Sequence, residues 1–102
     1  MTLEQQQKDY INYFDFTKIP EHMMENMFNY VHHGELLGGF LEAVFANDLF
    51  AATARADQNA LKILPTYVKW IYNEVPHTCH GSYEIVKNWY IKKDLERNHN
   101  EQ

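Results

Sequence analysis

The sequence predicts an all-α protein, a compact single-domain bundle of four to six short helices. Three observations predict this fold class. Apolar residues recur at spacings of three and four along most of the chain, as they do on the buried face of a helix. All four glycines fall in two short stretches, which mark turns between helices. The 102 residues, 45% of them apolar, suffice for one domain with one modest core.

The first well-marked helix is expected to begin at Pro20, to run to about His33 and to stop at Gly34. Proline suits the first helical turn because its missing N–H would be unpaired there, and glycine is favoured just past a helix end. The predicted core stripe of this helix has the spacing of one helix face and consists of Met24, Met27, Phe28 and Val31, and Met23 and Tyr30 widen it.

An earlier helix is expected from Leu3 to Phe14, with Tyr10, Ile11 and Phe14 facing inward. The two ends of the chain are polar and rich in Gln and Asn. We therefore expect residues 1–8 and 97–102 to fray from an otherwise single helical domain that spans residues 1–102.

A third helix should follow Gly38 and Gly39, with a shared apolar face made of Phe40, Leu41, Val44 and Phe45. Asp48 is a suitable N-cap for a short helix from Leu49 to Ala56, because its carboxylate can accept a backbone N–H of the first turn.

Asp57 can cap the next and strongest helix, from about Gln58 to Val75. Its apolar residues fill an arc of roughly 200°, which is wider than one neighbour can cover. Either this helix is central and packed on two sides, or one edge, formed by Tyr67 and Trp70, meets a partner. Pro65 lies near the polar side, where a kink is tolerated.

Pro76 ends that helix, and Ser82 is a natural N-cap for the last one. The inward face of the last helix is expected to end near Tyr90. Beyond it, Ile91 and Leu95 lie on a different side. They are an exposed patch, a dimer contact or part of the fraying tail, and the sequence leaves these alternatives open.

The charge distribution disfavours nucleic acid as a partner. The net charge is −5, and residues 1–60 alone carry −6. Binding to nucleic acid depends on neutralising phosphates, which an acidic surface cannot do. The basic residues of the last helix are interrupted by Asp94 and Glu96, which indicates a solvated face; they are Lys87, Lys92, Lys93 and Arg97.

The cysteine content and the apolar stretches of the sequence predict a protein of the cytoplasm that is not embedded in a membrane. A single cysteine, Cys79, cannot form an internal disulfide, so a reducing compartment is the natural setting. The longest apolar stretch, from Phe40 to Ala54, is interrupted by polar residues and cannot be a membrane span.

The turn after Pro76 holds a weak candidate metal site in His77, Cys79 and His80. Zinc takes thiolate and imidazole ligands, but these spacings match no zinc signature. Catalysis by the Cys79 thiol would need a base held within hydrogen-bond reach and a group to orient it, and no orienting group is evident. We therefore expect no metal, no cofactor and no catalytic centre.

Short motifs along most of the chain resemble a group of small helical proteins encoded in bacteriophage and prophage genomes. They cover roughly residues 19–90 and read Ile19-Pro20, His33-Gly34, Gly39-Phe40-Leu41-x-Ala43-Val44, Asn47-Asp48-Leu49, Arg55-Ala56-Asp57, Tyr72-Asn73-Glu74-x-Pro76, Gly81-Ser82 and Trp89. In that group an aromatic residue stands at the position of His80. The resemblance implies a phage accessory protein that acts in the bacterial cytoplasm and binds host machinery without an active site.

We therefore expect a non-catalytic protein that binds and modulates or inhibits a host bacterial protein, such as a restriction or CRISPR component. The candidate contact residues lie on four surfaces and are Tyr67 and Trp70, Glu35, Leu36 and Leu37 of the glycine-rich turn, Glu21 and Glu25, and Ile91 and Leu95. Three alternatives stay open: a phage protein associated with nucleic acid, a metal-dependent protein that uses the His/Cys turn, and a self-assembling structural component that forms homodimers.

Overall fold

The computed structural model describes residues 15–100, with side chains through residue 98, and this part of the chain consists of helices joined by short turns, without a strand. It contains two short 3-10 helices, η1 and η2, and six α-helices. Their bounds are η1 Phe16–Lys18, α2 Glu21–His33, α3 Gly39–Phe45, α4 Leu49–Arg55, α5 Gln58–Lys62, α6 Leu64–Glu74, η2 His77–Cys79 and α7 Tyr83–Asn100. The all-α prediction is confirmed, and the expected helix from Leu3 to Phe14 lies outside the described residues.

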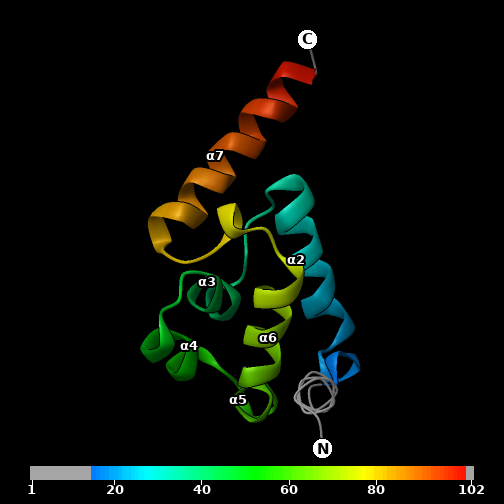
Figure 1. Ribbon diagram of the computed structural model, residues 1–102, viewed down its shortest axis with the longest axis vertical. Coiled ribbons are helices and arrows are strands. Elements are labelled where there is room, and N and C mark those ends of the chain that lie inside the picture. Colours follow the sequence, from blue (N-terminus) through cyan, green and yellow to red (C-terminus); the bar gives the residue numbers. More distant parts are fainter. Residues whose placement is uncertain (1–14, 101–102) are drawn as a thin grey trace, which may run out of the picture.

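The helices form a small body from which α7 projects (Figure 1). α2 and α6 lie beside each other, α3 and α4 pack together, and α5 closes the lower end. The first half of α7 packs on this body next to η2, and its second half continues past the end of α2. α7 runs to Asn100, so most of the C-terminal stretch that the sequence analysis expected to fray is helical.

Tyr30 of α2 lies at the centre of the core and has no exposed surface. Its ring packs edge-on against Phe45 of α3 and Tyr90 of α7, with centroids 5.0 and 5.4 Å away. Its hydroxyl donates a 2.7 Å hydrogen bond to the backbone oxygen of Cys79, and its own backbone oxygen accepts the indole N–H of Trp89 at 3.0 Å. One side chain thus connects α2, α3, η2 and α7.

The N-terminal caps predicted from the sequence are present. The carboxylates of Asp48 and Asp57 accept the backbone N–H groups of Ala51 and Ala60, at 3.0 and 2.7 Å. The hydroxyl of Ser82 accepts the N–H of Ile85 at 3.1 Å. Each cap satisfies a donor that has no partner within its own helix.

The long helix predicted from Gln58 to Val75 is divided in two at Ile63. Pro65 occupies the first turn of α6, where its missing N–H costs nothing, and its ring disfavours a continuous helix through Leu61. The expected kink is therefore a break, and α5 and α6 follow each other with a single non-helical residue between them.

The inward face of α2 differs from the predicted stripe. Met27 and Tyr30 are fully buried, whereas Phe28 is about half exposed and stacks on His32, with ring centroids 5.6 Å apart. Tyr30, which spacing placed only at the border of the stripe, lies at the centre of the core because Phe45 of α3 and Tyr90 of α7 pack on its ring.

Candidate protein-binding groove

An open groove of about 550 Å³ lies between the turn that follows α2 and the outer face of α7. We call it the α7 groove, and its lining residues are Gly34, Glu35, Leu36, Tyr90, Ile91, Asp94 and Arg97. Three of the predicted contact residues, Glu35, Leu36 and Ile91, are therefore brought together from positions more than fifty residues apart in the sequence.

Gly34 allows the chain to leave α2 along the side of α7. It adopts a left-handed conformation with φ of 70°, and its N–H donates to the backbone oxygen of Tyr30 at 2.9 Å. A Cβ atom at this position would lie 2.4 Å from the Cβ of Lys93. Only glycine permits both this φ and this close approach, so the turn is seated directly against α7.

Asn26 holds the next part of the turn from both sides. Its amide nitrogen donates to the backbone oxygen of Leu36, and its amide oxygen accepts the N–H of Gly38, both at 3.2 Å. The backbone around Leu36 is fixed by these two bonds, while the Leu36 side chain remains 75% exposed. A large apolar side chain is thus held in solvent by a fixed backbone.

Tyr90 joins the turn to α7 and α3. Its hydroxyl accepts the N–H of Leu37 and donates to the carboxylate of Glu42, both at 3.2 Å. Burial raises the pKa of the Tyr90 phenol, and the neighbouring Glu42 carboxylate raises this pKa further. The phenol therefore keeps its proton and continues to donate to Glu42 at neutral pH.

The outer face of α7 supplies apolar side chains beside paired charges. Ile91 and Leu95 are 49% and 62% exposed, one helical turn apart. The guanidinium of Arg97 lies 3.3 Å from the carboxylate of Asp94, and both residues line the groove with Ile91. Apolar groups bordered by polar groups that can exchange partners are typical of protein-binding surfaces.

Tyr67 and Trp70 do not form a partner-facing edge. They are 1% and 8% exposed, and Trp70 packs against Phe28 of α2 while Tyr67 packs edge-on against Phe40 of α3. The wide apolar arc predicted for residues 58–75 had two interpretations, a helix packed on two sides or a partner contact through Tyr67 and Trp70. At Tyr67 and Trp70 the helix is packed on two sides. These residues belong to the core because α2 and α3 approach α6 from either side.

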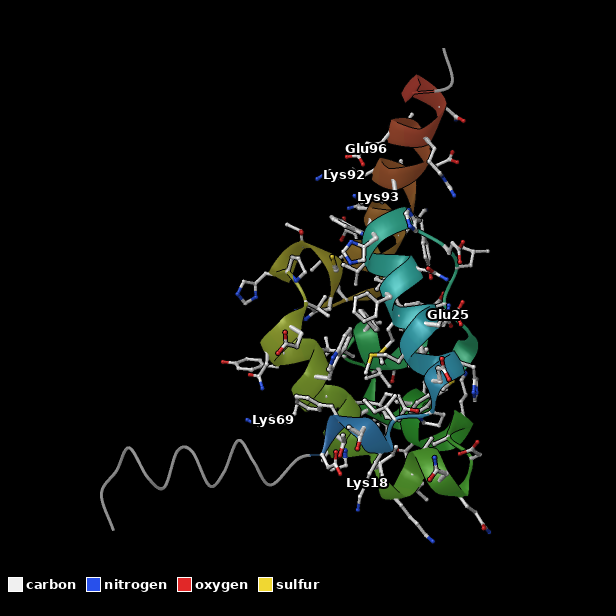
Figure 2. All side chains as sticks on the ribbon, turned by 90° about the vertical axis from the view of Figure 1, so that its right-hand side faces the viewer. Lys18, Glu25, Lys69, Lys92, Lys93 and Glu96 are labelled. Carbon is white, nitrogen blue, oxygen red and sulfur yellow. The ribbon has the colours of Figure 1, made fainter. Side chains whose placement is uncertain are left out.

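Leu37, Glu21 and Glu25 also lie away from the groove. Leu37 is only 7% exposed and points into the core. Glu21 and Glu25 are exposed on the first turns of α2, and Figure 2 shows Glu25 well below the turn that follows this helix. They are separated from Gly34 by two or more helical turns, about 13 Å or more along the axis.

The His/Cys turn shows no metal-binding geometry. Within residues 15–98, no group of three His, Cys, Asp or Glu side chains is arranged to hold a metal ion. The ring centroids of His77 and His80 are 5.9 Å apart. Cys79 is fully buried, and this burial raises the pKa of its thiol, which disfavours the thiolate that a metal or a nucleophilic reaction requires.

Lys92 and Lys93 contact other side chains of the same helix, α7. The ammonium groups of Lys92 and Lys93 lie 5.1 and 4.9 Å from the ring centroid of Trp89, and that of Lys93 is 3.3 Å from the carboxylate of Glu96. Figure 2 shows the three charged residues, Lys92, Lys93 and Glu96, grouped on the second half of α7. Their positive charge is partly compensated within the helix.

Sequence reasoning did not identify Asn26, Tyr90, Asp94 or Arg97 as parts of a protein-binding site. A polar residue inside a helix, such as Asn26, is a weak signal, because nothing local indicates that its partners lie ten and twelve residues further on. Tyr90 was placed in the core on its spacing, and its hydroxyl bonds depend on how α7 crosses the turn.

Comparisons with models of known protein families, with curated proteins and with solved structures find no match to this chain. Across residues 15–100, no helix has both the length and the apolar character needed to cross a bilayer. The α7 groove is therefore interpreted from its own geometry.

Proposed function

We propose that this chain is a non-catalytic protein-binding protein whose partner docks in the α7 groove. The observation that carries the proposal is Leu36, which is 75% exposed although Asn26 fixes the backbone on both sides of it. A fixed apolar anchor loses little conformational entropy on binding, which is what an interface hot spot requires.

The remaining lining residues suit the same function. Ile91 continues the apolar surface onto α7, and Glu35, Asp94 and Arg97 add charges of both signs to the lining. Leu95, which does not line the groove, is exposed one helical turn beyond Ile91. The partner segment that this surface fits is apolar at its centre and carries charged residues of both signs at its edges. Electrostatic pairing at such an edge contributes to partner choice more than to affinity.

The proposed kind of partner and the proposed compartment come from the resemblance to phage-encoded proteins. On that basis the partner is a host bacterial protein, with a component of an antiviral defence system as the first candidate, and binding takes place in the bacterial cytoplasm. This narrower proposal depends on analogy, whereas the docking surface depends on the groove itself.

The test is capture of partners from bacterial lysate by the tagged full chain, read by mass spectrometry. We expect one protein in stoichiometric amount, and we expect it to be lost in the variants Leu36→Asp and Ile91→Asp. Both side chains are exposed, so the free energy of unfolding should change by less than about 0.5 kcal/mol. Circular dichroism and urea unfolding of each variant check this point.

Leu49→Asp is the matched control. Leu49 is 66% exposed at the first position of α4, where the helix dipole tolerates an added carboxylate. This variant should retain the partner. Equal loss in all three variants would contradict the groove as the docking site.

Self-association through the same surface is the second candidate, because Ile91 and Leu95 also suit a contact between two copies. It requires that the mass of the isolated protein rise with concentration and that Ile91→Asp abolish the rise. Light scattering on the purified chain distinguishes this outcome from capture of a host protein.

A further inference from the structure

A second cavity, separate from the α7 groove, lies between α3 and α6, which are neighbours in the body of the molecule (Figure 1). It has a volume of about 200 Å³, and we call it the α3–α6 hollow. Its walls include the apolar side chains of Val44 and Phe45 from α3 and of Val68 and Ile71 from α6. An apolar cavity of about 150 Å³ is large enough for benzene, so the hollow has room for one aromatic ring.

The walls of the hollow are held in place by the core and by one backbone contact. Phe45 and Ile71 are buried, and the ring of Phe45 packs on Tyr30. The N–H of Gly81 donates to the backbone oxygen of Phe45 at 2.7 Å, which seats the chain after η2 against the end of α3. Gly81 has a φ of 128°, a region that residues with a Cβ atom rarely adopt. A cavity with walls fixed in this way is typical of small-molecule sites, because binding requires little ordering of the protein.

His80 adds one hydrogen-bond acceptor to these apolar walls. Its ring lines the hollow and donates a hydrogen bond to the backbone of Val75. Its buried Nε2 atom has no hydrogen-bond partner among the described residues, so the donated proton is the one on Nδ1. A neutral imidazole with its proton on Nδ1 carries an accepting lone pair on Nε2. A ligand that donates to Nε2 therefore supplies a hydrogen bond that the described chain does not, and a buried acceptor left without one costs free energy.

The open side of the hollow is formed by side chains that are free to turn. Asn47, Val68 and Tyr72 are exposed, and all three line the hollow. Because Nε2 is buried, a ligand reaches it only when a side chain on the open side turns aside. Rotamer changes of this kind are common on binding. The ring of Tyr72 also offers an aromatic ligand a surface on which to pack.

We propose that the α3–α6 hollow binds a small uncharged aromatic molecule whose O–H or N–H group donates to Nε2 of His80. Phenols and indoles belong to this class. The volume suits one ring system, and the bare lone pair of Nε2 selects a donor over an acceptor. A charged ligand is disfavoured, because no lining residue in the described chain carries a formal charge while His80 is neutral, and burial of an unpaired charge is costly.

The test is a titration of the isotope-labelled full chain with phenol, followed through the backbone amide signals. We expect saturable shifts centred on Val44, Val68 and Gly81. The dissociation constant should be about 1 mM or below, as suits a ligand of this size. No saturable shift, or shifts centred on the α7 groove, would overturn the proposal.

Fluorobenzene tests the hydrogen bond, because it has a similar shape, is more apolar than phenol and has no donor. We expect wild type to bind phenol about fivefold more tightly than fluorobenzene, although the hydrophobic effect alone favours fluorobenzene. Fluorobenzene binding at least as tightly as phenol would contradict donation to Nε2.

His80→Leu removes the acceptor and should weaken the binding of phenol without weakening that of fluorobenzene. His77→Leu is the matched control, because His77 is exposed close by and does not line the hollow. It should keep the preference for phenol. Equal weakening of both ligands in His80→Leu would contradict the proposed role of His80, and the order of the two ligands in wild type decides the question if this variant does not fold.

N-acetyltyrosinamide carries the same phenol group on a peptide backbone and separates a free ligand from a tyrosine side chain of a partner protein. We expect it to bind more weakly than phenol, because the hollow has room for one ring and not for the attached backbone. Tighter binding than phenol would overturn the assignment to a small molecule.

Discussion

Gly34 is constrained both by its left-handed backbone conformation and by the neighbouring Lys93 side chain. Substitution at this position should therefore destabilise the fold. Its φ is 70°, and an added Cβ would meet the Cβ of Lys93 at 2.4 Å. We expect Gly34→Ala to lower the free energy of unfolding by about 1–3 kcal/mol, because the left-handed conformation and the clash both act against it. Urea denaturation measures the change.

Gly39→Ala is the control for this prediction. A Cβ at Gly39 would lie 3.6 Å from the Arg55 side chain, an ordinary contact, and Gly39 is the first residue of α3. Alanine there should leave the free energy of unfolding unchanged or raise it slightly. A similar loss for both variants would mean that the α2–α3 turn is less tightly seated on α7 than the structure indicates.

His80 is expected to make the free energy of unfolding depend on pH. Among the described residues its buried Nε2 atom has no hydrogen-bond partner, and burial lowers the pKa of His80 against the opposing effect of a hydrogen bond to the backbone of Val75. In the unfolded chain a histidine titrates near pH 6.5. The unfolded state therefore binds more protons as the pH falls, and the contribution present above about pH 6.5 is lost below it.

The measurement is urea unfolding of wild type and His80→Leu at several values between pH 8 and pH 5. The two proteins differ only at position 80, so the difference between their pH profiles isolates the effect of His80. We expect wild type to lose more stability than His80→Leu as the pH falls from 7 to 5. Parallel pH profiles would show that the folded protein accommodates protonated His80 without cost.

At the scale of the element, α4 and α5 depend on their caps. They have seven and five residues, which is too short for a stable isolated helix. We expect Asp57→Ala to lower the free energy of unfolding by about 1 kcal/mol, because the N–H of Ala60 loses its acceptor. Asp57→Asn keeps an acceptor at that position and should recover most of the loss.

Asp48→Ala should be more damaging than Asp57→Ala. Besides capping α4, the carboxylate of Asp48 accepts the hydroxyl of Tyr83 at 2.6 Å, which connects the start of α4 to the start of α7. Tyr83→Phe removes only the second contact. If the two aspartate variants lose the same stability while Tyr83→Phe loses none, the contact with α7 contributes nothing.

α7 shows how one helix can serve two purposes along its length. Its first half is held by Val86 and Trp89 in the core and by the hydrogen bonds of Tyr90 to Leu37 and Glu42. Its second half extends beyond the body (Figure 1). Ile91, at the middle of α7, and Leu95, one turn further on, are exposed. The rigid first half fixes the direction of the projecting half, so the proposed binding residues are positioned without loop flexibility.

At the scale of the whole molecule, Tyr30 is the point where four elements meet. Its hydroxyl donates to the backbone oxygen of Cys79 in the buried core. We expect Tyr30→Phe to lower the free energy of unfolding by about 1–3 kcal/mol, because a buried acceptor would lose its partner. Thermal or urea unfolding measures the loss.

Tyr72→Phe is the matched control, since Tyr72 is 68% exposed and its hydroxyl can be replaced by water contacts. It should change stability by less than about 0.5 kcal/mol. Equal behaviour of the two variants would contradict the central role of the Tyr30 hydroxyl.

The sequence by itself determined the features that depend on neighbouring residues. Apolar spacing predicted the all-α fold class, and the ends of the helices were predicted at Gly34, Asp48, Asp57 and Ser82. These signals are local, because a cap or a helix end needs only a side chain or a backbone conformation within a few residues. The break at Ile63 was expected only as a kink, although its cause, Pro65, was visible.

The tertiary structure decided which apolar faces are buried and which residues meet. Tyr67 and Val68 are adjacent and both apolar, yet only Tyr67 lies against α3. The α7 groove likewise depends on where α7 crosses the turn after α2, which brings Leu36 and Ile91 together. Spacing defines the faces of each helix, but the contacts between helices are set by the packing of all of them at once, and no local pattern encodes that outcome.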